Sequence, residues 1–191
     1  MVKFHTAVGA DKPASLVTRK AYNELDGEQL YRGIAPVSHL RSDLTMVKTP
    51  VECAEQLMEG GIGDCFPSRG IYGDGVAYAS NSVQTGRNYA SGFGSEKGCI
   101  AVFKIKEDAR IIDYDDAVRL FEEIADAHPK DGSPYFNRQQ VGSMHEVGKA
   151  MQILGYDIIY QARGDGMNVH FYIILNRDAI VGIDDDYIMR L

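Results

Sequence analysis

An arginine inside an otherwise apolar strand is the first feature of this sequence that could do chemistry. Arg32 lies in the segment 29–34, whose aromatic and aliphatic residues predict a β-strand. A cation in such a segment is costly unless it is paired, so Arg32 needs a partner. Its guanidinium could bind a phosphate through two hydrogen bonds, and Gly33 would let the ligand approach the backbone. The alternative is an edge-strand arginine that points to water or pairs with an aspartate.

A glycine-rich segment at 70–75 is the second feature. Gly73 and Gly75 permit a tight turn with accessible backbone amides. The strand expected next would present Tyr78 and Ser80 on one face, because side chains alternate along a strand. Such a face suits the wall of a nucleotide site, although a turn of this kind often has no other role. The glycines open onto a strand and lack Gly-x-Gly-x-x-Gly spacing, which excludes a Rossmann dinucleotide fingerprint.

A mixture of helices and strands must position these residues. Thr49 as N-cap, Pro50 at the first helical position and Glu52 predict a capped helix that ends at the glycines 60–61. The remaining signals predict strands at 76–79, 99–105, 109–114, 157–161, 170–176 and 179–183, of which 157–161 and 170–176 are expected to pair. They predict helices from the caps at 80–82 to Gly92, from Asp115 onward, and over 139–154 before Gly155; the helix from Asp115 should bury Val118, Leu120, Phe121 and Ile124. Loops are expected at 63–75 and 128–136. We therefore expect an N-terminal arm at 1–26 and one α+β domain at 27–191.

Composition restricts the function. The chain has 191 residues, of which 45% are hydrophobic, enough for one domain with its own core. No apolar run approaches the roughly 20 residues that cross a bilayer, and the first residues lack the apolar core of a secretory signal. We therefore expect a cytoplasmic protein that does not enter a membrane. The net charge of -7 argues against nucleic-acid binding and favours a protein partner or a small ligand.

Metal and disulfide chemistry are not expected. Cys53, Cys65 and Cys99 are widely spaced and odd in number, which argues against a disulfide framework and a zinc site and indicates inert cysteines. The acidic run 184–186 lacks the spacing of a calcium loop and reads as a solvated terminus.

Two segments resemble motifs of the ADP-ribosyltransferases. Leu-Tyr-Arg-Gly at 30–33 resembles the arginine motif of that family. Gly-x-Gly-x-x-Tyr-Ala at 73–79, followed by Tyr89 and Ala90, is similar to the family's glycine-rich strand and the helix after it.

A third segment lies near the end of the chain. The run 171–180 resembles the strand that follows the family's catalytic loop, and its Leu-Asn-Arg-x-Ala is similar to phage-encoded members. With the strand at 109–114, the resemblance covers about residues 30–183, and its motifs occur in the family's order.

The resemblance implies a fold and an activity. The fold would be ADP-ribosyltransferase-like, with two packed mixed or antiparallel sheets and flanking helices. The protein would be a mono-ADP-ribosyltransferase that cleaves NAD at the nicotinamide-ribose bond and transfers ADP-ribose to a protein or other macromolecule. NAD is then a substrate, no metal takes part, and a phage-encoded enzyme would modify a host factor in the host cytoplasm. The alternative is an inactive binding, inhibitor or virion-associated protein on the same scaffold.

The resemblance also implies roles for residues. Arg32 would hold the pyrophosphate or ribose of NAD and take part in catalysis, Tyr78 or Tyr89 would stack on nicotinamide, and Ser80 would support the same pocket. The cofactor-binding set implied in this way is Arg32, Gly33, Gly73, Gly75, Tyr78, Ser80 and Tyr89.

The sequence departs from the family at the catalytic acid. The family's glutamate is expected where 170–172 reads His-Phe-Tyr. The reaction needs a carboxylate to hold the ribose 2′-hydroxyl and to stabilise the positive charge that develops as nicotinamide leaves. Asp165, in a Gly-Asp-Gly turn, is the predicted catalytic residue, Asp157 is the second candidate, and the carboxylate could also be absent.

Two of these residues have plainer explanations. Asp165 could serve only the geometry of a hairpin turn. His5 could take the ribose-holding place that a histidine has in some branches of the family, or it could be a surface residue of the arm.

Overall fold

The structure of the chain is a computed structural model, and it describes residues 29–35, 49–59, 69–70, 73–74, 76–91, 98–127, 144–162 and 169–191. The arm predicted at 1–26, the loop predicted at 128–136 and Cys65 lie outside these residues.

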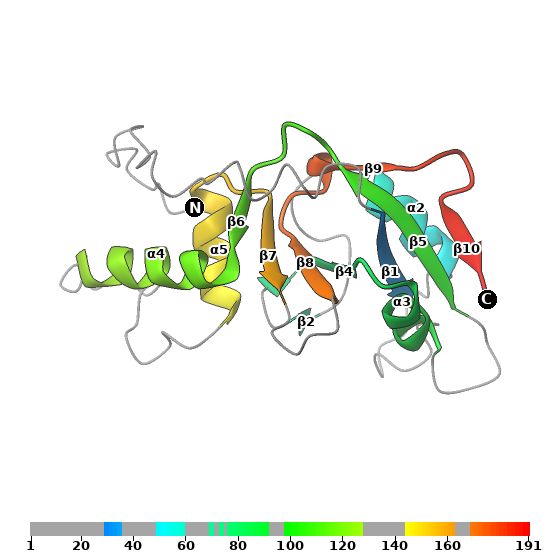
Figure 1. Cartoon of the computed structure of the whole chain (residues 1–191), viewed down its shortest axis with the longest axis horizontal. Coiled ribbons are helices and arrows are strands. Elements are labelled where there is room, and N and C mark those ends of the chain that lie inside the picture. The colour runs from blue at the N-terminus through cyan, green and yellow to red at the C-terminus, as the bar shows by residue number, and fades with distance from the viewer. Residues whose placement is uncertain are drawn as a thin grey trace.

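Most of the described strands form one eight-stranded mixed sheet. In spatial order they are β10 (Ile188–Arg190), β5 (Cys99–Ile105), β1 (Leu30–Ile34), β4 (Ala77–Ser80), β8 (His170–Ile174), β7 (Ile158–Ala162) and β6 (Ile111–Asp113), while β9 (Ile180–Gly182) also pairs with β5. Among the described pairs, β6 and β7 run parallel and the others antiparallel. Figure 1 shows that the sheet curls from β7 toward β5.

This architecture confirms the α+β class but differs from the expectation of two packed sheets. Instead of a second layer, the remaining described strands β2 (Arg69–Gly70) and β3 (Gly73–Asp74) form a two-stranded ribbon inside the predicted loop. The strands predicted at 99–105 and 109–114 are β5 and β6, which stand at different ends of the sheet. The paired strands predicted at 157–161 and 170–176 are confirmed as β7 and β8.

In the described part of the chain, four α-helices cover the two faces of the sheet: α2 (Pro50–Met58), α3 (Val83–Ala90), α4 (Tyr114–Ala127) and α5 (Met144–Ile153). In Figure 1, α4 and α5 lie at the β6 end, and α2 and α3 lie near β1 and β5. We call the side of the sheet that carries Leu30, Phe103 and Tyr172 the α2 face, because these residues share a core with α2. Helices α3, α4 and α5 pack on the opposite face.

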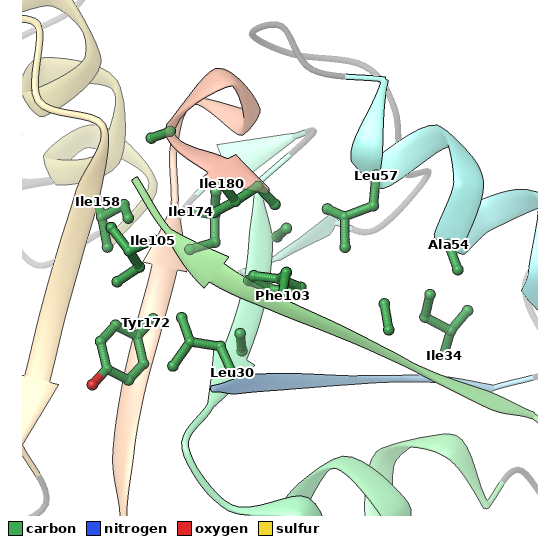
Figure 2. Packing of buried hydrophobic residues seen from close by; sticks show 14 of the residues in the cluster. Leu30, Ile34, Ala54, Leu57, Phe103, Ile105, Ile158, Tyr172, Ile174 and Ile180 are labelled. Carbon is green, nitrogen blue, oxygen red and sulfur yellow. The ribbon is translucent and has the colours of Figure 1, made fainter. Parts of the chain in front are cut away.

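The core of the α2 face joins the helix to the strands. Figure 2 shows Ala54 and Leu57 projecting from α2 toward Ile34 and Phe103. Leu57 and Phe103 have no solvent exposure. Burial of apolar surface of this kind is the main favourable term that holds a helix on a sheet.

Local signals in the sequence set several helix ends. The capping box is present, since the Thr49 backbone N–H donates to Glu52 Oε2 at 2.6 Å and the Glu52 N–H donates to Thr49 Oγ1 at 3.2 Å. Ser82 caps α3 by accepting from the Thr85 N–H at 3.3 Å. Gly155 has a φ of 75° after α5, the left-handed conformation that favours glycine at a helix end.

The end of the chain has more structure than the sequence indicated. A 3-10 turn (η4, Arg177–Ala179) precedes β9, and β10 follows the acidic run 184–186 and pairs with β5. The three aspartates of that run are exposed, as expected for a solvated segment.

Burial makes Cys99 an unreactive thiol. Its Sγ donates to the Pro50 carbonyl oxygen at 3.2 Å. Burial, with a smaller contribution from Cys53, raises the pKa of the Cys99 thiol to about 11, although Arg190 acts in the opposite direction.

We therefore expect iodoacetamide at pH 8 to leave Cys99 unmodified in the folded protein. At that pH a thiol with a pKa near 11 is only about 0.1% thiolate, and the thiolate is the reactive form. Peptide mass mapping before and after unfolding in guanidinium would measure the labelling. Equal labelling of Cys99 in both samples would contradict this description.

Candidate functional site

Arg32 lies where two central strands separate. Strands β1 and β4 pair at Tyr31 and Ser80, and no further pair is formed between their described residues. At the next position, the Arg32 Nη1 donates to the Tyr78 carbonyl oxygen at 2.9 Å. The guanidinium thus joins the two strands where their backbones part. Arg32 is half-buried, and strand alternation places it on the α2 face with Leu30 and Ile34.

Gly33 is explained by helix packing. A Cβ at this position would lie 1.9 Å from the Gly86 carbonyl oxygen and 2.6 Å from the Ala90 backbone nitrogen, both in α3. The space above Gly33 on the opposite face is therefore filled by α3 and not by a ligand. A contact between NAD and the Gly33 backbone stays a prediction.

The other predicted pocket residues lie on the opposite face from Arg32. Tyr78 packs against the core that contains Ile173. Ser80 is buried, and its Oγ accepts from the Ser82 N–H at 3.1 Å, so it stabilises the turn into α3. Tyr89 projects from α3 with 66% of its surface exposed. The structure does not bring these three side chains onto the face that carries Arg32.

The remaining predicted residues are only partly described. Gly73 pairs with Gly70 in the β2–β3 ribbon. Gly75, Asp165 and His5 lie outside the described residues.

Asp157, the second candidate for the catalytic acid, has a structural role. Its Oδ2 accepts from the Arg110 backbone N–H and its Oδ1 from the Asn176 side chain, both at 2.8 Å. Asp157 precedes the first residue of β7, whereas His170 pairs with Ala162 at the other end of that strand. Asp157 is therefore placed away from the position where the acid was expected, and a catalytic role for this residue stays a prediction.

A histidine and a tyrosine form the polar contact at the expected position of the acid. The Tyr160 hydroxyl and His170 Nδ1 are 2.9 Å apart, and the ring centroids are separated by 5.4 Å. Both side chains are half-buried. Alternation along β7 and β8 places them on the α2 face with Ile158, Tyr172 and Ile174, as Arg32 is. The sequence alone predicted the pairing of the strands, but the Tyr160 contact depends on their register.

An aspartate lies next to this pair on the neighbouring strand β6. Asp113 in β6 is aligned with Tyr160. Burial raises the pKa of the Asp113 carboxyl, and the negative charges of Asp115 and Asp116 raise it further. Hydrogen bonds from the backbone N–H groups of Asp115 and Asp116 lower this pKa. The Asp113 Oδ1 accepts from the Asp115 N–H at 2.9 Å, at the start of α4, so this side chain contributes to the helix terminus.

The described residues show neither a metal-binding group nor a membrane-spanning helix. Across the described ranges, no three His, Cys, Asp or Glu side chains are grouped so that they could hold a metal ion. Within the same part of the chain, no helix has the length and apolar character to cross a membrane.

Comparisons with known proteins add no family. The sequence matches no protein-family model and no curated protein.

Proposed function

We propose that the protein is a mono-ADP-ribosyltransferase that cleaves NAD at the nicotinamide-ribose bond and transfers ADP-ribose to a macromolecular target. The observation that carries the proposal is the adjacency of the three motif segments. The arginine motif is β1, the Tyr-Ala part of the glycine-rich motif is in β4, and the C-terminal motif begins in β8. These segments are far apart in sequence, yet they occupy three neighbouring strands. A shared substrate could therefore contact all three.

Arg32 is suited to hold the pyrophosphate of NAD. Its bond to the Tyr78 carbonyl restrains the guanidinium. A restrained guanidinium favours a two-point contact with phosphate, since less side-chain freedom is lost on binding.

Tyr89 is suited to stack on an aromatic ring. Tyr89 is exposed. A Cβ built on Gly33 would lie 2.8 Å from the Tyr89 Cβ, so Tyr89 lies directly beside the arginine motif. An exposed tyrosine offers a large flat surface at a small cost in conformational entropy. We propose that Arg32 carries NAD binding; stacking of nicotinamide on Tyr89, which lies on the opposite face of the sheet, stays a prediction.

The biological setting follows from the resemblance. We propose a phage-encoded enzyme that modifies a protein of its host. The acidic net charge of -7 favours a target with a basic surface.

Nicotinamide release from NAD tests the activity. We expect the purified protein to release nicotinamide slowly in water and faster with its target. Arg32→Ala should lower kcat/KM at least about tenfold, because a hydrogen bond to a charged group contributes roughly 1.5–3 kcal/mol. Arg32→Lys should also lose activity, since an ammonium keeps the charge but not the planar donor pair. Chromatography of the released nicotinamide gives both rates.

Arg119→Ala is the matched control. Arg119 is an exposed arginine on α4 whose ion pair with Asp116 is on the surface, so its loss should leave both stability and turnover nearly unchanged. Melting curves of the variants separate a loss of fold from a loss of activity. A wild type that releases no nicotinamide, or folded Arg32 variants with unchanged turnover, would contradict the proposal.

One observation favours a second candidate, an inactive NAD-binding protein on the same scaffold. A histidine stands where the family has its glutamate. Calorimetry separates the two candidates, because binding of NAD without release of nicotinamide would favour the second.

A further inference from the structure

His170 shares a face and a neighbourhood with Arg32. Strand β4 alone separates β1 from β8, and Tyr31, Ser80 and Phe171 stand in one row across the three strands. Arg32 lies on one side of this row and His170 on the other, so their backbones are roughly 12 Å apart, which is two strand spacings across and two residues along the sheet. On the α2 face, β4 contributes Ala77 and Ala79, whose side chains are small. Tyr172 on β8 lies closer to Arg32 but has no solvent exposure, so the half-buried His170 is the polar side chain, among the described residues of this face of β4 and β8, that a ligand held by Arg32 could reach.

The backbone of His170 is held in place independently of its side chain. Its N–H donates to the Asn81 Oδ1 at 2.9 Å, and its carbonyl oxygen accepts from the Asn81 N–H at 3.4 Å. Asn81 directly follows β4, so these bonds fasten the start of β8 to the end of β4. Because they use only the backbone of His170, they remain when the side chain is changed.

The side chain is oriented by Tyr160. The hydroxyl of Tyr160 lies 2.9 Å from Nδ1, so the contact occupies that nitrogen and directs Nε2 away from Tyr160. When the proton is on Nδ1 and is donated to the tyrosine oxygen, Nε2 carries a lone pair and is a hydrogen-bond acceptor. A contact at one ring nitrogen commonly fixes the role of the other in this way.

We propose that His170 is the catalytic residue that replaces the missing glutamate, and that Tyr160 is its positioning residue. This inference rests on the proposed function. In the reaction, the bond between C1′ and the nicotinamide nitrogen breaks, and its electron pair leaves with neutral nicotinamide. Nε2 of His170 accepts a hydrogen bond from the ribose 2′-hydroxyl while positive charge develops at C1′. The oxygen of water or of the target then forms the new bond to C1′ and loses its proton to solvent.

Variants of His170 test the assignment. His170→Ala should lower nicotinamide release at least about tenfold while NAD affinity by calorimetry changes little, since Arg32 is intact. Added imidazole should restore part of the activity of His170→Ala, an effect that a purely structural role does not produce. His170→Glu supplies the family's acceptor and should be as active as the wild type or more so. Tyr160→Phe should lose roughly two- to tenfold, the equivalent of one hydrogen bond.

Gln161→Ala is the control from the same strand. Gln161 lies between Tyr160 and Ala162 and points to the other face, across from Phe171, so its loss should leave turnover unchanged. If the wild type is active and His170→Ala is equally active, His170 is not catalytic and only this inference fails. If the wild type releases no nicotinamide, the proposed function fails and this inference fails with it.

Discussion

Gly33→Ala is expected to destabilise the protein by about 3 kcal/mol or more. The added Cβ would lie 1.9 Å from the Gly86 carbonyl oxygen, and both that atom and the Ala90 nitrogen belong to the backbone of α3. A flexible side chain could turn aside, but here the whole helix must move away from β1. Overpacking of this kind typically costs 1–3 kcal/mol, and contacts with backbone lie at the upper end. The free energy of unfolding in guanidinium measures the change.

Gly182→Ala is the matched control for this change. A Cβ at Gly182 would meet only side-chain atoms of Tyr187, at 3.2 to 3.4 Å. The ring can shift by a few tenths of an ångström, so we expect a loss below about 1 kcal/mol. If both variants were equally stable, α3 would not be packed on Gly33 as described, and the position above Gly33 would again be open to a ligand.

The features predicted best from the sequence are those with local causes. Thr49, Pro50 and Glu52 begin a helix through contacts within four residues, and Gly155 ends one through its own φ. The pairing of β7 with β8 was also predicted, because two β-rich segments flank a short turn. Such signals act between neighbours in the sequence and can be read without knowledge of the rest of the chain.

The features that were missed depend on contacts between distant residues. Nothing near 111–113 indicates that this strand pairs in parallel with β7, or that 188–190 returns to pair with β5. The expectation of two packed sheets came from the resemblance alone, whereas the described strands form one curled eight-stranded sheet and the short β2–β3 ribbon.

The candidate site shows the same division. Arg32 was recognised because a charge in an apolar strand is conspicuous. Alternation predicts that Tyr78 and Ser80 share a face, but whether Arg32 lies on that face depends on how β1 and β4 pair. The contact between Tyr160 and His170 depends likewise on the register of β7 and β8. Residue types therefore identified candidates, while register decides which of them can act together.

Asp157→Ala is expected to destabilise the protein by roughly 3 kcal/mol while leaving the turnover of folded molecules unchanged. The substitution removes the acceptors of the Arg110 N–H and of the Asn176 amide. Each donor left without a partner in a part-buried place costs about 1–3 kcal/mol. These bonds join the segment before β6, the start of β7 and the end of β8, so their loss should lower the melting temperature in a single transition.

Asp185→Ala is the control for Asp157→Ala, because Asp185 is an exposed aspartate in the turn before β10. This substitution should change the free energy of unfolding by less than about 0.5 kcal/mol. Nicotinamide release is then compared at a temperature where all variants are folded. A stable Asp157→Ala protein without turnover would return Asp157 to the active site. An unstable protein with full turnover per folded molecule would show that Asp157 holds the sheet together and takes no part in the proposed reaction.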